Sequence, residues 1–252
     1  MEWPAGYQRR LLGEVSSTLD VARQIFSEID EPEWILAQNQ TSPRGRNGRK
    51  WISGERNFSA TLLMRLDESP QAAALRSFVM SLALFDALVA IVGPAHGLSL
   101  KWPNDVLLNC GKLAGILLES CRGRNKSIEL AIGIGVNLLD APVGRTIEKR
   151  AANPVSLFGE TGVSIEAVRF MDYLAASYAR RERQFRDLGF ESIRVDWLKH
   201  AARLGDIIEA VTRVSRLVGV FETVDRDGNL VLNTADGPKK IAAADVFFEG
   251  VH

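Results

Sequence analysis

The sequence predicts an α+β protein in which a mixed β-sheet is flanked by helices and followed by a small β-barrel. Leu113–Leu118 and Leu130–Ile134 are almost entirely apolar, as expected of central strands buried on both faces. Long segments of helical periodicity precede and follow these strands. After Leu204, short strand-like runs alternate with Asp-Gly turns, which is typical of a small barrel of roughly 50 residues. We therefore expect a catalytic domain over residues 1–204 and a barrel over 205–252.

The helices follow from apolar spacing and from residues that start or end helices. Ser17–Ile29 has an apolar period of 3.6 residues, and Ser16, Ser17 or Thr18 can cap its start. Pro70 occupies a permitted first-turn position, and Gly93-Pro94 ends that helix. The predicted helices are Ser17–Ile29, Pro70–Val92, Ser164–Leu188 and Ile193–Leu204.

The strands are short apolar runs bounded by turn residues. Asn109-Cys110-Gly111 is typical of a tight turn between two of them, and the segment Leu139–Ala152, rich in Pro, Gly and charge, is expected to be a loop. The predicted strands of the first domain are Trp34–Gln38, Phe58–Leu66, Leu98–Trp102, Val106–Asn109, Leu113–Ser120 and Ile128–Leu138. Those of the barrel are Gly205–Thr212, Arg216–Val224, Leu230–Thr234 and Lys240–Glu249.

The composition is that of an ordinary globular enzyme. Of 252 residues, 31 are Lys or Arg and 31 are Asp or Glu, so a surface built to bind polyanions throughout is excluded. Two cysteines in a chain of this length indicate a reducing compartment, and the three scattered histidines do not form a zinc motif. We find no signal peptide. The apolar run Phe78–Val92 is interrupted by polar residues and reads as too short and too polar to span a bilayer. We expect a cytoplasmic protein with no membrane partner.

The segment Arg44–Trp51 combines four cations with two glycines in seven residues and ends in a tryptophan. Glycine allows close approach to a ligand, and the arginine fork matches carboxylate and phosphate oxygens. A loop that closes over an anionic ligand needs this mixture, although a solvated basic loop or a nucleic-acid arm has the same composition. Trp51 either stacks on a ligand or anchors the loop in the core.

A second motif makes a small-molecule site more plausible. Lys101–Asp105 reads KWPND, and Gly111–Gly115 reads GKLAG. Asp105 and Lys112 fall on neighbouring strands, so both can reach one cleft, or they can form a structural ion pair. Gly133-Ile134-Gly135 is too short for a dinucleotide fingerprint, and packing of a strand against a ligand or helix is an equal explanation.

These motifs, in this order, resemble those of biotin–protein ligases. The resemblance runs from about Leu12 to the C-terminus and includes Ser17-Thr18, Gln40, the basic loop, KWPND, KLAGIL and Gly133–Asn137. KWPND and KLAGIL together are highly specific. Many members of the family begin with a helix-turn-helix repressor domain, for which the motif at residue 17 leaves no room here, so we expect the form without that domain.

The resemblance implies roles for individual residues. Those expected to be catalytic are Lys112, Arg46, Arg49 and Asp105, with Asp105 positioning or deprotonating the incoming lysine amine. Those expected to bind biotin are Ser17, Thr18, Gln40, Arg44, Gly45, Arg46, Lys112 and Gly115. Those expected to bind ATP are Arg46, Arg49, Trp51, Asn104, Lys112 and Asn137.

The implied reaction joins biotin and ATP as biotinyl-5′-AMP and then passes biotin to a lysine of a biotin carboxyl-carrier protein. Mg²⁺ is the implied cofactor, its ligands unassigned, and a homodimer is one possible assembly. Two positions depart from the family pattern. Pro43 replaces the first glycine of the loop, which removes an N–H and stiffens the hinge, and Leu19 replaces an asparagine, which removes a polar contact or shifts it to Asp20. Both bear on affinity more than on reaction type.

The sequence leaves three alternative functions to consider. A lipoate ligase shares the implied fold and adenylation chemistry but lacks the arginine-glycine loop followed by KWPND in this form. A nucleic-acid-binding module is disfavoured by the neutral net charge and by cations that are not interleaved with aromatic residues. A degenerate ligase that binds biotin but turns over poorly would follow from Pro43.

Overall fold

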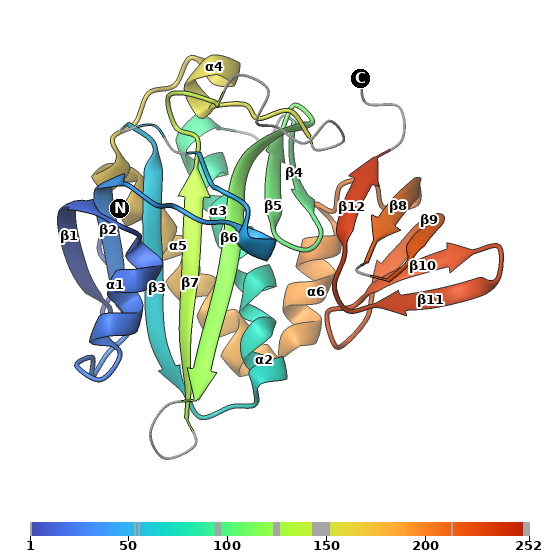
Figure 1. Cartoon of the computed structure of the whole chain (residues 1–252), viewed down its shortest axis with the longest axis horizontal. Coiled ribbons are helices and arrows are strands. Elements are labelled where there is room, and N and C mark those ends of the chain that lie inside the picture. The colour runs from blue at the N-terminus through green and yellow to red at the C-terminus, as the bar shows by residue number, and fades with distance from the viewer. Residues whose placement is uncertain are drawn as a thin grey trace.

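The structure, a computed structural model, describes residues 2–52, 54, 56–93, 97–122, 127–142, 152–212 and 214–248. A seven-stranded sheet has the strand order β1-β2-β3-β7-β6-β5-β4 (Figure 1). β1 and β2 are parallel and every other neighbouring pair is antiparallel. The predicted mixed sheet is therefore confirmed. Its strands are β1 (Gln8–Val15), β2 (Glu33–Gln40), β3 (Phe58–Leu66), β4 (Leu98–Lys101), β5 (Asp105–Leu108), β6 (Gly111–Arg122) and β7 (Ile128–Val136).

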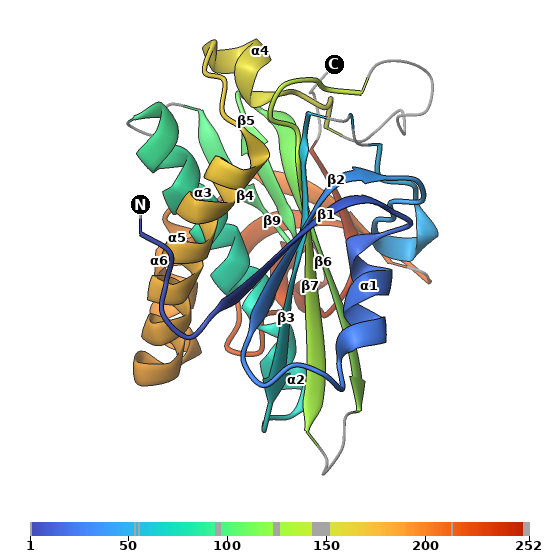
Figure 2. The same ribbon diagram turned by 90° about the vertical axis from the view of Figure 1, so that its left-hand side faces the viewer.

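The helices divide between the two faces of this sheet (Figure 2). On one face lies α1, whose Leu19, Ala22 and Ile25 pack on Ile35 and Leu63 of the sheet. On the other face lie the longer helices, with α3 against β4, β5 and β6 and α5 against β3. The helices are α1 (Thr18–Ile25), α2 (Pro70–Ala74), α3 (Arg76–Val92), α4 (Leu157–Thr161), α5 (Ala167–Leu188) and α6 (Phe190–Leu198), with a 3₁₀ turn η1 (Arg46–Gly48) in the basic loop.

Several boundaries differ from the predicted ones for local reasons. Ser17 caps α1, and its hydroxyl accepts a hydrogen bond from the backbone N–H of Leu19. The helix ends at Ile25, four residues earlier than predicted. The predicted helix Pro70–Val92 divides into α2 and α3 at Leu75, and α5 begins at Ala167. The predicted turn is confirmed, since Asn109 and Cys110 both have positive φ (49° and 66°), as a hairpin turn of this kind requires. Most of the predicted loop Leu139–Ala152 lies outside the described residues.

The segment Pro70–Val92 is, by length and composition, long and apolar enough to cross a membrane. The prediction that its inner run Phe78–Val92 is too short and too polar to span a bilayer was therefore wrong. Most of this segment is nevertheless buried inside the protein, where Val79, Leu82 and Leu84 are fully covered by the sheet and by the neighbouring helices. Its apolar character is accounted for by this core packing.

The C-terminal part forms a five-stranded antiparallel sheet, hereafter the C-terminal sheet, with the order β11-β10-β9-β8-β12. The predicted strand Lys240–Glu249 is two strands, because the chain bends at Ala242–Ala244. The strands are β8 (Ile207–Val211), β9 (Arg216–Val224), β10 (Leu230–Thr234), β11 (Gly237–Ile241) and β12 (Asp245–Phe248). Apolar residues of this sheet join the main core, and the Trp102 indole donates to the Gly228 carbonyl at 3.1 Å. The two sheets are thus packed together.

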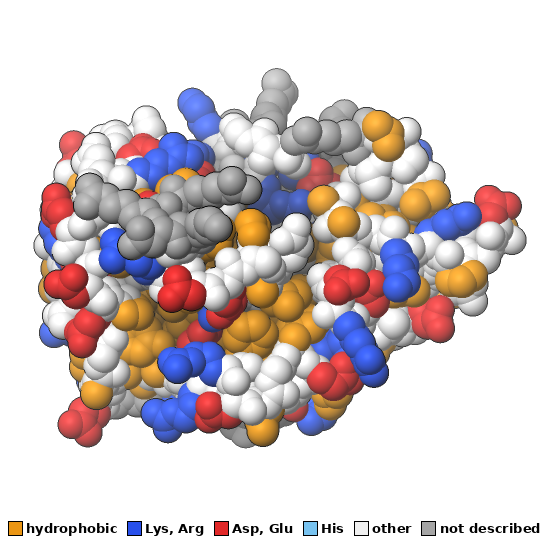
Figure 3. Space-filling model, turned by 90° about the horizontal axis from the view of Figure 1, so that it is seen from below, with side chains coloured by type: hydrophobic (Ala, Val, Ile, Leu, Met, Phe, Trp, Pro, Cys, Tyr) orange, Lys and Arg blue, Asp and Glu red, His pale blue; other side chains and the backbone are white. Residues whose placement is uncertain are grey.

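Charge is evenly mixed on the surface at the lower end of Figure 1. Figure 3 shows Lys and Arg side chains interspersed with Asp and Glu around hydrophobic ones on this face. The mixture agrees with the equal numbers of cationic and anionic residues in the sequence.

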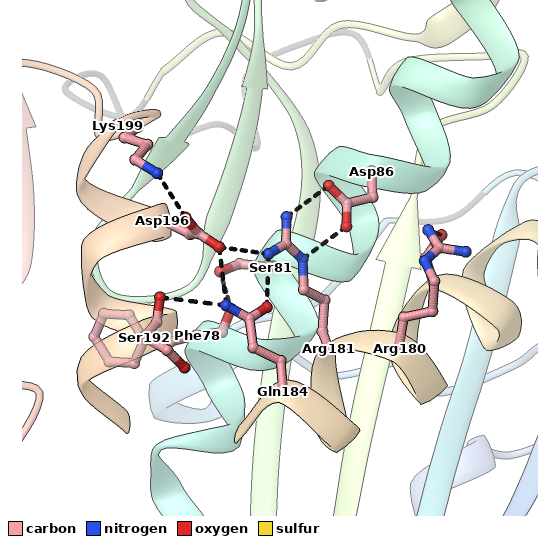
Figure 4. A network of polar contacts seen from close by, with 10 residues as sticks. Phe78, Ser81, Asp86, Arg180, Arg181, Gln184, Ser192, Asp196 and Lys199 are labelled. Atoms are coloured by element: carbon pink, nitrogen blue, oxygen red, sulfur yellow. Dashed lines mark hydrogen bonds and ion pairs between the residues drawn. The ribbon is translucent and has the colours of Figure 1, made fainter. Parts of the chain in front are cut away.

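A polar network joins α3, α5 and α6 (Figure 4). Arg181 pairs with Asp86 and with Asp196, each at 2.7 Å. Asp196 also accepts hydrogen bonds from Gln184 and Lys199. Partial burial alone would raise the pKa of Asp196, but these hydrogen bonds and the charge of Arg181 outweigh it and lower that pKa to about 2.

The network predicts a pH dependence of stability. A carboxyl group with a depressed folded-state pKa stabilises the fold above its unfolded pKa, and this contribution is lost as the pH falls through the folded-state value. For Asp196 the loss falls between about pH 4 and pH 2. We expect Asp196→Asn to flatten the decline of the thermal midpoint over this range, measured by circular dichroism. If the thermal midpoint of the variant fell with pH as steeply as that of the wild type, Asp196 would not contribute to stability in this range.

Candidate active site

A cavity of about 170 Å³ lies on the α1 face of the large sheet. The basic loop crosses in front of β7 and β6 (Figure 1) and forms the outer wall. Twelve of the thirteen residues predicted for the site line this cavity: Ser17, Thr18, Gln40, Arg44, Gly45, Arg46, Arg49, Trp51, Asn104, Asp105, Lys112 and Gly115. The prediction that Asp105 and Lys112 reach one cleft is thereby supported by the geometry.

One wall of the cavity is built where α1 begins. The Gln40 side-chain oxygen accepts hydrogen bonds from the Thr18 backbone N–H (2.8 Å) and hydroxyl (3.2 Å). Thr61 on β3 donates to the Thr18 hydroxyl at 2.8 Å. Thr18 is fixed to the sheet, and the Gln40 amide is held at the cavity wall in one orientation.

The basic loop is closed by its own backbone. The N–H of Gly45 donates to the carbonyl of Arg49, and the N–H of Trp51 donates to the carbonyl of Pro43. Asn47 and Gly48 turn the chain with φ of 56° and 72°. Pro43 therefore anchors the loop through its carbonyl oxygen.

Arg44 is anchored to the protein through all three of its nitrogens. It forms two hydrogen bonds of 3.1 Å with Glu119 and one of 2.7 Å with Asp20. These contacts raise the pKa of the Arg44 guanidinium, with the Glu119 hydrogen bond as the largest cause. Arg44 thus holds the loop against β6 and α1.

Arg46 and Arg49 extend to the other end of the cavity. Arg46 donates to the Asn104 side-chain oxygen at 3.2 Å, and Asn104 donates to the Ile116 carbonyl. Arg49 pairs with Asp245 of β12, which also lines the cavity. Asp245 was missed by sequence reasoning. No local signal distinguishes it, because only the packing of the two sheets brings β12 to the basic loop.

Lys112 and Asp105 face one another across the β5–β6 ladder. The Lys112 ammonium lies 2.7 Å from Asp105 Oδ1, an ion pair that lacks the angular geometry of a hydrogen bond. The same ammonium lies 5.7 Å from the centre of the Trp51 ring. The two alternatives considered for Asp105 and Lys112 are therefore both correct: the side chains line one cavity, and they form an ion pair.

Trp51 packs on the glycines of the cavity floor. A Cβ added to Gly135 would lie 2.4 Å from Trp51 Cε2, and one added to Gly115 would lie 3.1 Å from Trp51 Cζ3. Gly133 similarly leaves room for the side chain of Leu19. These glycines are needed for close packing against an aromatic ring and a helix residue.

Gly135→Ala should displace the Trp51 indole, because the ring cannot keep its place beside a new methyl group. Overpacking of this kind costs roughly 1–3 kcal/mol, so we expect a lower thermal midpoint. Differential scanning calorimetry measures this effect. Gly13→Ala, whose Cβ would meet nothing within 4 Å, is the control. Equal behaviour of the two variants would contradict the packing argument.

Asn137 does not line the cavity. It is buried, and its amide nitrogen donates to the Val155 carbonyl at 3.0 Å. Its role toward adenine stays a prediction.

Models of known families match both parts of the chain. The model of the biotin/lipoate A/B protein ligase family matches residues 13–137, and that of the biotin protein ligase C-terminal domain matches residues 208–249. A biotin–[acetyl-CoA-carboxylase] ligase of Paracoccus denitrificans is 45% identical over 95% of this chain and 100% of its own length. A bifunctional ligase/repressor of Bacillus subtilis is 29% identical over 92% of this chain and 71% of its own length.

The fold agrees with solved structures. A biotin protein ligase from Aquifex aeolicus, in complex with biotin and ATP, superposes with a TM-score of 0.80 at 23% identity, covering 95% of this chain and 97% of that one. The fold is that of biotin protein ligases. The chain belongs to the biotin/lipoate A/B protein ligase family, on its biotin–protein ligase branch.

Proposed function

We propose that this enzyme joins biotin and ATP as biotinyl-5′-AMP and then transfers biotin to one lysine of the biotin carboxyl-carrier domain of acetyl-CoA carboxylase. The observation that carries the proposal is the convergence of Arg46, Arg49 and Lys112 with Asp105 in one cavity above a glycine-lined floor. Three cations suit an anionic substrate and a phosphoryl reaction. The name of the Paracoccus relative supports the choice of acceptor.

In the first step, a carboxylate oxygen of biotin attacks the α-phosphorus of ATP, the bond to the β-phosphate oxygen breaks, and pyrophosphate leaves. Lys112, Arg46 and Arg49 offset the negative charge that develops on the phosphoryl oxygens. Thr18 and Gln40, fixed to one another at the far wall, suit the polar ring of biotin. Trp51 suits the adenosine.

Magnesium is expected to enter with the nucleotide. Among the described residues, no group of three His, Cys, Asp or Glu side chains could hold a resident metal ion. Asp105 and Asp245 are carboxylates in the cavity that could complete the shell of an ion carried by the phosphates, as Mg²⁺ prefers. The ion would supply further neutralisation of phosphate charge.

In the second step, the acceptor lysine must attack as a neutral amine. Asp105, at the cavity wall, can accept a hydrogen bond or a proton from that amine. The amine nitrogen then bonds to the biotin carbonyl carbon, and AMP leaves with the oxygen of the broken anhydride bond. We place this reaction in the cytosol, since Cys110 and Cys121 are exposed free thiols of the kind that a reducing compartment preserves.

The test is biotin- and ATP-dependent labelling of a purified carboxyl-carrier domain, followed by intact mass spectrometry. We expect a gain of one biotin on one lysine that disappears when ATP is omitted. Binding of biotin without transfer would indicate the degenerate form, and no binding of biotin would overturn the substrate assignment.

A further inference from the structure

Arg44 connects the basic loop to two carboxylates that lie outside the cavity. Its guanidinium forms two hydrogen bonds of 3.1 Å with the two oxygens of Glu119 on β6 and one of 2.7 Å with Asp20 on α1. Arg44 lines the cavity, whereas neither Glu119 nor Asp20 is among the described residues that line it. The two carboxylates therefore act on the loop and do not contact a ligand in the cavity. We call these three side chains the loop latch.

Both carboxylates of the latch are also held from their other sides. Glu119 Oε2 pairs with Arg23 of α1 at 2.9 Å, and Asp20 Oδ2 accepts a hydrogen bond from the Ser16 hydroxyl at 3.4 Å. The three latch side chains are only 21–34% exposed. A charge-assisted pair that uses both carboxylate oxygens in such a setting is stronger than an isolated pair on the surface. The carboxylates are thus already in place to receive the loop.

The other arginine contacts of the basic loop are made inside the cavity. Arg46 donates to Asn104, Arg49 pairs with Asp245, and all four residues line the cavity. In the proposed reaction Arg46 and Arg49 offset phosphate charge, so their contacts are shared with the substrate. The latch is not shared, because all three nitrogens of Arg44 are bound to carboxylates outside the cavity. The latch is therefore the contact that can stay in place throughout the reaction.

We propose, on the basis of the proposed function, that Glu119 and Asp20 are positioning residues for the intermediate. Through Arg44 they hold the basic loop closed over biotinyl-5′-AMP and set how long it is retained before transfer. Neither residue takes part in making or breaking bonds. Retention matters because a closed site keeps water from a reactive intermediate such as this mixed anhydride.

The test measures release of radiolabelled biotinyl-5′-AMP from the full-length protein after a chase with excess unlabelled compound, without carrier and without turnover. Glu119→Gln removes the charge from the bidentate pair, and we expect release to be roughly 5- to 30-fold faster. This is less than the full value of charged hydrogen bonds, because the pair is partly exposed. Asp20→Asn should have a smaller effect in the same direction. Adenylate formation in a single turnover at saturating biotin and ATP should keep the wild-type rate, because Arg46 and Arg49 are retained.

A matched control and a double variant separate the latch from general effects of charge removal. Glu191 on α6 likewise binds an arginine, Arg194, through both of its oxygens, and Glu191→Gln should release the intermediate as the wild type does. Because Glu119 acts through Arg44, Arg44→Met combined with Glu119→Gln should release it no faster than Arg44→Met alone. Additive effects of these two substitutions would overturn the proposal.

Folding and the proposed function are read separately. Thermal midpoints from circular dichroism should be the same for Glu119→Gln and Glu191→Gln. Faster release that appeared only with a lower midpoint, or an equal slowing of adenylate formation, would overturn the positioning role. Release by Glu119→Gln at the wild-type rate would overturn this inference alone. A wild type that does not bind biotinyl-5′-AMP would overturn the proposed function and this inference together.

Discussion

Replacing Lys112 by alanine should slow the formation of biotinyl-adenylate by on the order of 10²–10³-fold, the usual effect of removing one preorganised donor from a site of developing charge. Lys112 is the second residue of β6. Its ammonium is held over the cavity floor by the ion pair with Asp105 and by the Trp51 ring. The loss should appear in kcat, because this charge interaction strengthens as negative charge develops on the phosphoryl oxygens. Rapid-quench measurement of adenylate in a single turnover gives the rate directly.

Two further variants separate charge from position. Lys112→Arg keeps the charge but changes its shape and reach, so we expect partial activity. Lys199→Ala removes an exposed lysine that pairs with Asp196 on α6 and should leave the rate unchanged. Adenylate formation by Lys112→Ala at the wild-type rate would show that the lysine has no role in this step.

Replacing Arg76 by alanine should destabilise the protein by about 3–5 kcal/mol, because it leaves a buried carboxylate without its partner. Arg76 is 1% exposed and donates to Glu68 and to Glu182 at 2.8 Å each. Burial alone would lower its pKa, but the two carboxylates raise it above the ordinary value. The group is therefore charged in the core, where it ties the start of α3 to α5. Chemical denaturation measures the change in unfolding free energy.

The neighbouring groups define the control for Arg76. The Tyr178 hydroxyl donates a hydrogen bond to Glu182. At a second tyrosine, Tyr7, burial and the negative charge of Glu182 raise the pKa of the hydroxyl to about 12. The double variant Arg76→Met and Glu182→Gln removes both charges and should recover part of the lost stability. Arg169→Ala, an exposed pair with Asp172 at 3.6 Å on α5, should cost at most about 1 kcal/mol. Equal losses for Arg76→Ala and Arg169→Ala would refute the buried-charge argument.

The elements missed by sequence reasoning are those with weak local signals. β1 has mostly exposed side chains and pairs in parallel with β2, so its apolar pattern does not mark it as a strand. α4 is only five residues long. The strands β6 and β7 were predicted to within two residues at each end, because the residues at their centres are almost entirely apolar. The helices were predicted less accurately at their ends: the predicted helix Ile193–Leu204 is α6, Phe190–Leu198, in the structure.

The sequence alone determined the class of fold, the family and twelve of the residues that line the cavity, because apolar periodicity and contiguous motifs are local properties of the chain. Only the tertiary structure decided that Arg44 is an anchor, that Trp51 rests on Gly135, and that Asp245 belongs to the active-site region. These facts depend on contacts between segments far apart in the chain. Packing of the two sheets joins Arg49 to a residue 196 positions away, and no local pattern encodes such a contact.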